Sequence, residues 1–499
     1  MDLPTEMGCP MKLSPTPSAT EAPGALAKTP TPKLARSLGV GGNVLITLSS
    51  ISPASSVFIL GGAALSSFGT GVFWAFAIAG VVSILIAFCY ADLASSYPVA
   101  GGDYSLVTRA LGPSFGMATF FVNLISLPLI LAVFGLGVAD YLGVAIKGLS
   151  PVETGIAVVA LATITACFNI RTNAWLTGVF LFIEFAALGL LTVLGLVHVE
   201  RSPLTLLSLQ FLDPSTNSMA PLTIAGLVIA VTQGIFAYNG YGGAVYFSEE
   251  TKNATKAIAK AVLWSAIITI GAEIIPLAAI ILGASSLKDL FGAALPVEAF
   301  LSDRSGSVIS TIVLLAIALA IVNAIIAIAL QAGRLLYTAA RDNAMPAAIA
   351  RPLSRVTRRS HVPVIATATM GAIGVLACLI PIDVLLTATG STLAFTYLFI
   401  AVAALTNRRK PKPAGAYTMP LWPLPPALAV VALGGIFVIS FADPAQWTSL
   451  AISVGLVATG FVYYALYLRP RKATHLLLID GDAEDTESES HSDLEGELR

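Results

Sequence analysis

The chain alternates long apolar runs with short polar loops between residues 39 and 468. An apolar run of about 18 residues or more is long enough to cross the hydrocarbon core of a bilayer as a helix. Twelve such runs can be marked, and they predict an all-α integral membrane protein with twelve transmembrane helices. The predicted spans lie near 39–63, 70–92, 113–139, 151–170, 174–198, 220–247, 258–284, 306–338, 362–380, 384–405, 421–441 and 447–468.

The first predicted span has a proline and several serines at its centre, in the stretch SSISPASSVF. Pro53 has no N–H for the carbonyl four residues earlier, and its ring clashes with that carbonyl. In hydrocarbon, backbone groups freed in this way are tolerated only beside protein or a wet cavity. We therefore expect a break here, with a second half-helix opening at Ala54, Ser55 and Ser56. The alternative is an ordinary proline kink repaired by neighbouring serines.

The sixth predicted span contains a second weak point, in IFAYNGYGGAVYFSEE. Gly234, Gly240, Gly242 and Gly243 with Asn239 lower helix stability in mid-span, although close helix packing is another reason for glycines there. The two weak points lie five spans apart. That spacing is expected of two five-helix repeats of inverted topology, each beginning with a discontinuous helix, and it predicts a ligand site between them at the bilayer midplane.

This organisation divides the chain into five parts. Residues 38–198 form the first predicted repeat, residues 199–405 the second, and residues 406–468 two extra helices. Residues 1–37 are rich in Pro, Thr and Ala without a continuous apolar core, so they predict a disordered cytoplasmic leader and no cleavable signal peptide. Residues 469–499 predict an acidic disordered cytoplasmic tail.

Composition also indicates a membrane protein, and it argues against a soluble globular protein. Of the 499 residues, 56% are hydrophobic and 11% are charged, which is too apolar for a soluble globular protein of this length. The four cysteines have no paired spacing, so neither a disulfide framework nor a metal site is indicated. The sequence shows no nucleophile–base set, phosphate loop or cluster with metal-ligand spacing. We expect neither an enzyme nor a bound cofactor.

The placement of lysine and arginine predicts the orientation, because cytoplasmic loops carry an excess of both. With the N-terminus inside, the outward loops carry four such residues: Lys147, Arg201, Lys288 and Arg304. Both termini are then cytoplasmic, and we expect the host to be the cell (plasma) membrane. The inward loops carry Arg109, Arg171, Lys252, Lys256, Lys260, Arg334, Arg341, Arg351, Arg355, Arg358, Arg359, Arg408, Arg409, Lys410 and Lys412.

Three stretches resemble a known family. They are YADLASSYPVAGGDYSLVTRALG after the second span, FAYNGYGGAVYFSEETKNATKAIAKA through the sixth, and GRLLYTAARDNAMP closing the eighth. Over residues 38–468 the chain resembles the amino acid permeases of the amino acid-polyamine-organocation superfamily. It departs from that pattern where PASS replaces a glycine-rich run in the first span, and where Ala254 and Ala259 replace prolines.

The resemblance implies how the two breaks bind a zwitterion. The amides of the second half-helix would hold a carboxylate, and carbonyls at both breaks would accept hydrogen bonds from an ammonium group, in keeping with helix dipoles. Phe236 would form an aromatic lid, although packing is an alternative role for the aromatic residues of the sixth span. The residues expected to bind substrate are Ser52, Ala54, Ser55, Ser56, Phe236, Ala237, Tyr238, Asn239 and Tyr241.

Glu184 is the clearest acidic residue inside a predicted span. A charge at that depth is costly enough to indicate function, and by the resemblance Glu184 falls where proton-dependent relatives often carry a lysine. We expect it to couple transport to protons, with a permanently neutral structural role as the alternative. Sodium is less favoured, because Asn323 is the only obvious side-chain ligand in the outer half of the eighth span.

The remaining polar residues receive simpler interpretations. Glu273 lies near the outer end of its predicted span and is expected to reach water. Asn123 and Gln233 either line the cavity or hydrogen-bond between helices. Residues expected to form ion pairs or loop contacts at the cytoplasmic gate are Asp92, Asp103, Glu249, Glu250, Arg334, Arg341 and Asp342.

The sequence therefore predicts a secondary active transporter that moves a small amino acid by alternating access, with the proton as the coupling ion. The alternatives are a transporter of an amine without a carboxylate, such as a polyamine or ethanolamine, and an amino acid exchanger. A nutrient receptor on a transporter fold is the alternative from a different class. The expected partners are a small-molecule substrate and the lipid bilayer, and no nucleic acid.

Overall fold

The computed structural model describes residues 36–143, 146–168, 170–357, 361–442 and 444–471. The leader expected over 1–37 and the tail expected over 469–499 lie almost wholly outside the described residues.

Helices make up nearly all of the described chain, and ten helical segments are long and apolar enough to cross a bilayer. The prediction of a multi-pass helical membrane protein is confirmed. The ten segments comprise α1 (Val40–Ile51), α2 (Pro53–Ser55), η1 (Ser56–Gly61) and α3 (Gly62–Phe68) in one span; α4 (Gly71–Ser96); α6 (Pro113–Leu142); α8 (Ile170–Val197); α9 (Ile224–Ala237) with η3 (Tyr241–Glu250); α10 (Ala254–Gly283); α12 (Pro296–Arg341); α15 (Ile382–Asn407); α16 (Leu424–Ala442); and α17 (Trp447–Tyr463) with η5 (Tyr464–Leu468) and α18 (Arg469–Arg471).

Two further apolar helices, α7 (Pro151–Ala166) and α14 (Val364–Ala377), occupy the predicted fourth and ninth spans but are shorter. The count of twelve spans therefore stays a prediction. The remaining short helices and turns in the described residues are α5 (Gly102–Leu111), η2 (Pro203–Leu207), α11 (Leu287–Gly292), α13 (Ala347–Leu353) and η4 (Pro444–Gln446).

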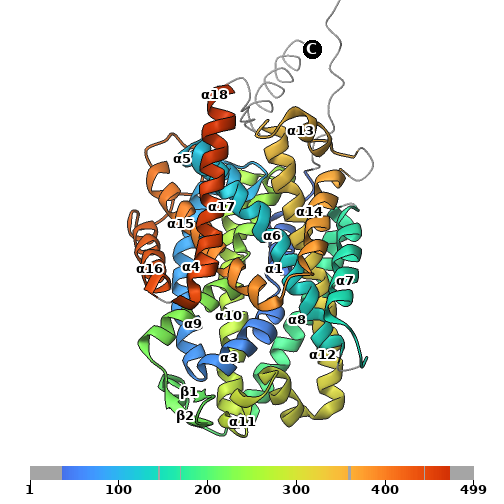
Figure 1. The fold of residues 1–499 in the computed structure, drawn as a ribbon, viewed down its shortest axis with the longest axis vertical. Coiled ribbons are helices and arrows are strands. Elements are labelled where there is room, and N and C mark those ends of the chain that lie inside the picture. Colours follow the sequence, from blue (N-terminus) through green and yellow to red (C-terminus); the bar gives the residue numbers. More distant parts are fainter. Residues whose placement is uncertain (1–35, 144–145, 169, 358–360, 443, 472–499) are drawn as a thin grey trace, which may run out of the picture.

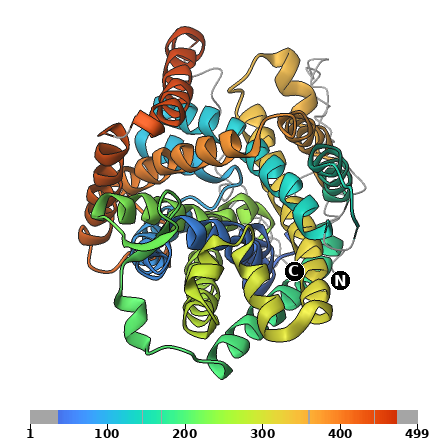
Figure 2. The ribbon, with the colours of Figure 1, turned by 60° about the horizontal axis from the view of Figure 1, so that its bottom comes forward.

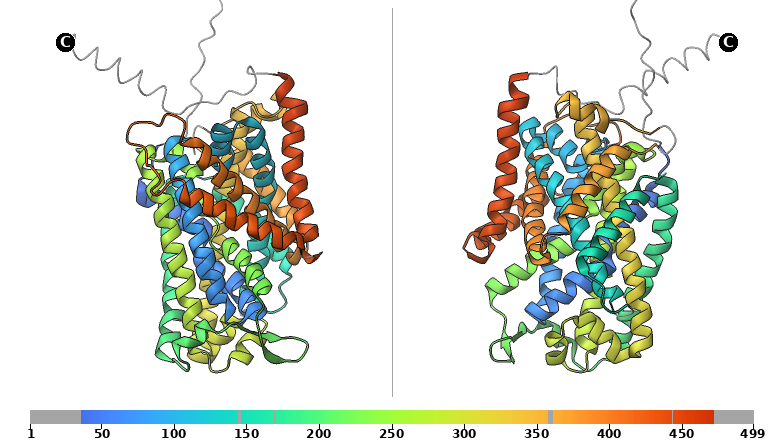
Figure 3. Two further views of the ribbon diagram at one scale, coloured as in Figure 1. Left: turned by 90° about the vertical axis from the view of Figure 1, so that its left-hand side faces the viewer. Right: turned by 45° about the vertical axis from the view of Figure 1, so that its right-hand side comes forward.

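The helices run between two distinct ends of the molecule. Figure 1 shows α5, α13 and α18 at one end, and α11 with the strands β1 and β2 at the other. We call these the α5 end and the hairpin end. The long helix α12 packs against α6, α8 and α14, while α16 and α17 lie on the periphery (Figure 3). Seen from the hairpin end, α1 to α3 lie among the other helices (Figure 2).

One small sheet departs from the predicted all-α class. Strands β1 (Gln210–Asp213) and β2 (Ser218–Pro221) pair antiparallel in the connection between α8 and α9. The end of the first span fits against β1, because a Cβ at Gly69 would lie 2.1 Å from the Gln210 carbonyl oxygen. Gly69 also has a positive φ of 56°, so glycine suits this contact for two reasons.

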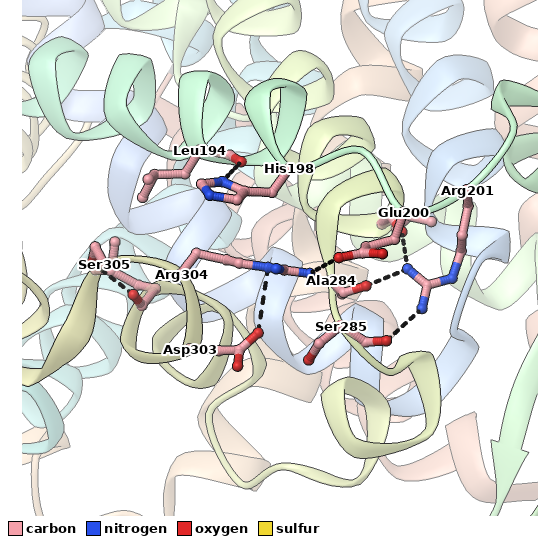
Figure 4. A network of polar contacts seen from close by, with 11 residues as sticks. Leu194, His198, Glu200, Arg201, Ala284, Ser285, Asp303, Arg304 and Ser305 are labelled. Atoms are coloured by element: carbon pink, nitrogen blue, oxygen red, sulfur yellow. Dashed lines mark hydrogen bonds and ion pairs between the residues drawn. The ribbon is translucent and has the colours of Figure 1, made fainter.

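Polar contacts tie together the loops at the hairpin end (Figure 4). Arg304 of α12 pairs with Glu200 at 3.0 Å, and Arg201 donates to the backbone carbonyls of Ala284 and Ser285. These bonds join the segment after α8 to the segment after α10. They hold the outer rim of the bundle without contributing to the cavity described below.

Candidate functional site

The first apolar span is interrupted at Ser52. The helix α1 ends at Ile51, and Ser52 adopts the left-handed conformation with φ 50° and ψ 74°. A non-glycine residue rarely adopts positive φ, and its persistence next to Pro53 marks a constrained position. The hydroxyls of Ser52 and Ser55 lie 2.6 Å apart across the break. The helix then resumes and passes through a π-helical turn, η1.

The sixth span is interrupted at the same depth. The helix α9 ends at Ala237, Gly240 has a φ of 123°, and the chain continues as the 3₁₀ segment η3. A Cβ at Gly240 would lie 2.7 Å from the Ile51 side chain, so only glycine allows the two breaks to touch. The Ser56 hydroxyl donates to the Ala237 carbonyl at 3.0 Å, which joins the breaks by a direct hydrogen bond.

A cavity of about 70 Å³, walled by both polar and apolar side chains, lies against both breaks. A single water needs roughly 10–15 Å³ in this measure, so the cavity has room for several waters or a small solute. Helices far apart in sequence build its wall. The wall comprises Ser50, Ile51, Ser56, Leu60, Tyr90, Asp103, Asn123, Ser126, Leu127, Ile130, Phe134, Phe236, Ala237, Asn239, Gly240, Gly242, Gly243, Tyr246, Ile328, Gln331, Thr389 and Leu393.

A buried carboxylate forms the floor of this cavity toward the α5 end. Asp103 accepts hydrogen bonds from Tyr90 at 2.6 Å, Asn123 at 2.8 Å and Tyr246 at 3.1 Å. Burial raises the pKa of Asp103, and these three donors oppose that rise. The sequence suggested a loop or gate contact for Asp103 and missed its place in the cavity wall.

The glycine pair before Asp103 explains how the first turn of α5 reaches the cavity. Gly101 and Gly102 both have positive φ, which turns the chain back toward the bundle. A Cβ at Gly102 would lie 2.1 Å from the Tyr246 ring, so this ring packs directly on the glycine backbone. The sequence AGGD carried this signal, but only the fold shows which side chains it brings together.

An aromatic residue separates this cavity from a second one toward the hairpin end. Phe236 and Leu60 line both this cavity and an outer cavity of about 240 Å³. Gln233 also lines the outer cavity and donates to the Leu60 carbonyl at 3.1 Å. The outer cavity is completed by Ile59, Ala63, Ile229, Thr232, Leu386, Gly390, Ser391, Ser440 and Gln446.

The structure brings only some of the expected substrate-binding residues into the cavity wall. Ser56, Phe236, Ala237 and Asn239 line it, and Tyr397 donates to the Asn239 side chain at 3.0 Å. The backbone amide of Ser56 is already bonded to the Ser52 carbonyl at 3.0 Å. Ser56 therefore presents its hydroxyl to the cavity, where the sequence suggested its amide.

The other expected residues lie behind the wall. Tyr238 packs edge-on against Phe76 at 5.5 Å, and Tyr241 stacks on Tyr397 at 5.9 Å. Neither ring lines the cavity. Residues of the first break that also do not line the cavity are Ser52, Ala54 and Ser55.

Two buried glutamates flank the first break. Glu184 of α8 faces the Ser52 hydroxyl and the Ala54 amide, and Glu273 of α10 faces the Ser56 hydroxyl. Each side chain is 0% exposed, and neither carboxyl group closes a hydrogen bond to another described residue. The expectation that Glu273 reaches water is wrong, because its side chain is fully buried in a helix that packs against α4 and α8.

Asn323 makes hydrogen bonds to two side chains. It donates to the Ser49 hydroxyl and accepts from the Thr177 hydroxyl at 3.3 Å. Its amide therefore joins α12 to α1 and α8. A helix-joining role is a sufficient reason for this polar residue in an apolar span.

Ion pairs close the α5 end beneath the cavity. Arg334 makes two hydrogen bonds to Glu250, of 2.7 and 3.0 Å, and its guanidinium lies over the Phe247 ring at 4.7 Å. Arg341 binds Glu249 through two bonds of 2.8 Å, and Glu249 also accepts from the backbone amide of Ala100 at 3.0 Å. These contacts join η3 to α12 and to the loop before α5.

Taken together, the described residues form a multi-pass helical membrane protein with two interrupted spans beside a cavity that has both polar and apolar walls. A family model described as amino acid permease matches residues 40–466. The chain belongs to the amino acid permease family, within the superfamily that the sequence motifs indicated.

Similar proteins carry transporter names. The chain is 23% identical over 457 residues to a branched-chain amino acid permease of Bacillus subtilis, an alignment covering 87% of this chain and 94% of the relative. It is 22% identical over 468 residues to a methylthioribose transporter of the same species, covering 89% and 95%. It is 27% identical over 198 residues to a large neutral amino acids transporter small subunit 2 of Mus musculus, covering 38% and 36%.

Proposed function

We propose that this protein is a secondary active transporter that carries a small amino acid across the membrane by alternating access. The observation that carries the proposal is the pair of interrupted spans, which touch at Gly240 and bond through Ser56 at the wall of the cavity. Interrupted helices present unpaired backbone dipoles at membrane depth, and these suit a small charged solute. Family membership supports amino acid transport.

The substrate ammonium group would bind among the carbonyls of the sixth-span break, at Ala237 and Asn239. Its carboxylate would lie near the start of the helix that follows Pro53, where the helix dipole favours an anion. Leu127, Ile130 and other apolar wall residues suit an aliphatic side chain. A branched-chain amino acid such as leucine is therefore the first substrate to test.

The ion pairs at the α5 end indicate how the cavity would open. Glu249 and Glu250 hold η3 to α12, so the cavity can open toward that end only if these ion pairs separate. Phe236 stands between the cavity and the outer cavity and would act as the lid on that side. Alternating access would then be a movement of the two interrupted spans against the rest of the bundle.

Proton coupling through Glu184 is part of the same proposal. The carboxyl group lies beside the Ser52 hydroxyl and the Ala54 amide at the break, so a change in its charge would act directly on the first interrupted span. Replacing Glu184 by Gln should remove the pH dependence of uptake measured at saturating leucine, where changes in affinity do not contribute. Unchanged pH dependence would leave Glu184 with a structural role.

The complete topology belongs to the proposal as well. It comprises twelve spans, a five-plus-five inverted repeat over 38–198 and 199–405, and two extra helices. Both termini would be cytoplasmic in the cell membrane, with the α5 end inward. Labelling of single cysteines placed in the β1–β2 hairpin and in α13 of intact cells tests the orientation.

Uptake into proteoliposomes tests the function directly. Leucine should be taken up, whereas isopentylamine, which lacks the carboxylate, and 4-methylpentanoate, which lacks the amine, should compete weakly. Strong competition by the amine alone would favour a transporter of non-carboxylated amines. Uptake that requires internal amino acid would indicate an exchanger, and no uptake or competition by any of these solutes would contradict amino acid transport.

A further inference from the structure

Glu273 is a buried carboxyl group with no role in the proposed transport cycle. Its side chain is 0% exposed, and both of its oxygens lack a hydrogen-bond partner among the described residues. Burying a polar group without a partner is unfavourable, and ionisable residues inside membrane spans usually have a function. The residues around Glu273 indicate which groups its carboxyl group can act on.

The helix face that carries Glu273 is directed at the junction of the two breaks. One turn earlier, Ile270 packs on Gly80, which the Tyr238 ring also contacts. One turn later, Leu277 packs on Gly61 in η1. Residues three and four apart share a helix face, so Glu273 points between the first break and Tyr238.

Glu273 reaches the cavity through a single intermediate. Its carboxyl group faces the Ser56 hydroxyl, and that hydroxyl donates to the Ala237 carbonyl at 3.0 Å. Ser56 and Ala237 both line the cavity, whereas Glu273 does not. Any effect of Glu273 on a ligand therefore passes through the Ser56 hydroxyl or through its charge.

The Ser56 hydroxyl has one proton, so it can donate to only one acceptor at a time. When Glu273 is protonated, it can donate to the Ser56 oxygen, and Ser56 continues to donate to the Ala237 carbonyl. When Glu273 is ionised, its carboxylate attracts the Ser56 proton, because hydrogen bonds to a charged acceptor are stronger. The Ala237 carbonyl is then released to accept a hydrogen bond from a substrate ammonium group.

Few ionisable groups near Glu273 compete with this effect. The Tyr238 phenol is close enough to feel its charge, and Glu184 faces the other side of the first break. The glycines that contact this face from α4 and η1, namely Gly80 and Gly61, carry no charge. Among the described residues, the charge on Glu273 therefore has the main electrostatic influence on this side of the breaks.

We propose that Glu273 is a positioning residue whose proton is displaced when substrate binds, and that Ser56 relays this exchange to the Ala237 carbonyl. The proton passes from the carboxyl group to water as the substrate ammonium takes up the released carbonyl. Binding linkage is reciprocal, so substrate affinity must rise with pH over the range in which Glu273 ionises. The inference rests on the proposed function, since it assumes a substrate with an ammonium group.

Binding of leucine to the purified protein between pH 5.5 and 8.5 tests this inference. Calorimetry gives the affinity, and a pH-indicator dye in weak buffer gives the protons released. The wild type should bind more tightly at high pH, by a factor in the range of about 5 to 150 that is typical of coupled sites, and should release protons on binding. Glu273→Gln should remove both the pH dependence and the proton release.

Three further variants test whether the effect of Glu273 passes through the Ser56 hydroxyl. Ser56→Ala keeps the carboxyl group but removes the relay, so proton release should fall strongly. Ser265→Ala, at a buried polar residue two turns away on α10, should retain the release. Thr269→Val, a change of similar shape at another buried polar residue of α10, should also retain it.

The outcomes distinguish this inference from the proposed function. If leucine and the other tested amino acids do not bind the wild type at any pH, the proposed function fails. If they bind and the proton release survives Glu273→Gln, the inference is overturned while the function stands. Loss of release in Glu273→Gln but not in Ser56→Ala would reject the relay through Ser56.

Discussion

The buried ion pair at the α5 end offers a quantitative test of how strongly burial couples two charges in this fold. Arg334 and Glu250 have side chains that are 0% and 1% exposed, and two hydrogen bonds of 2.7 and 3.0 Å join them. Replacing Glu250 by Gln leaves the guanidinium with the Leu330 carbonyl and the Phe247 ring but without a counter-charge. The backbone carbonyl of residue 250, which accepts from two backbone amides at the start of the first span, is unaffected by this change.

The magnitude follows from burial. Removing one partner of a buried ion pair costs about 3–5 kcal/mol, because the remaining charge stays desolvated. We therefore expect Glu250→Gln and Arg334→Met each to lower the free energy of unfolding by about 3 kcal/mol. The double variant should lose much less than the sum, which gives a coupling energy of about 2 kcal/mol or more.

The assay is a double-mutant cycle on purified protein, with unfolding followed in mixed detergent micelles. The pair Arg341 and Glu249 provides a matched control, since it has similar bond lengths but side chains that are 17% and 18% exposed. Its coupling energy should be smaller, because water already screens the two charges. Equal coupling in both cycles, or coupling near zero for the buried pair, would refute the reasoning.

Three other predictions concern the lid, the floor and the loop after α12. Phe236→Ala should open the cavity toward the outer cavity and raise the KM for uptake. The increase should be up to about tenfold, because losing one aromatic contact costs a free energy of that size. An unchanged KM would argue against a lid at Phe236. Gly102→Ala should destabilise the fold by more than Gly112→Ala, because both glycines have positive φ but only a Cβ at Gly102 meets a side chain, that of Tyr246; similar thermal shifts would contradict this. Burial raises the pKa of Asp342 from 3.8 to about 6, so its contribution to stability is present below pH 3.8 and is lost as the pH rises through about 6. Between pH 4 and 8, the free energy of unfolding of Asp342→Asn should rise relative to the wild type, by about 3 kcal/mol at the upper end, because one unit of pKa difference is worth about 1.36 kcal/mol. A difference between the two proteins that stays constant with pH would contradict this prediction.

The sequence anticipated the helical membrane class and the positions of the apolar helices. These features depend on runs of neighbouring residues, and a bilayer makes the length of an apolar run informative. The interruption beside Pro53 was equally local, because a proline removes its own hydrogen bond wherever it lies. The β1–β2 hairpin was missed because its strands are four residues long and carry no strong alternation.

The candidate site was predicted less completely. Ser56, Phe236, Ala237 and Asn239 were expected at a binding site and do line the cavity. Asp103 was assigned to a loop, because its position in the wall depends on two glycines turning the chain back against Tyr246. Such contacts join residues more than a hundred positions apart, and no local pattern encodes them.

What the sequence determined by itself was where backbone hydrogen bonds are lost and which segments lie in lipid, since both follow from residues within a few positions of one another. Tertiary structure alone decided which polar groups face the cavity. Tyr238 and Tyr241 pack away from it, whereas Glu184 and Glu273 are buried on either side of the first break. The physical reason is that the direction of a side chain is set by the rotation of its helix, and packing against distant segments fixes that rotation.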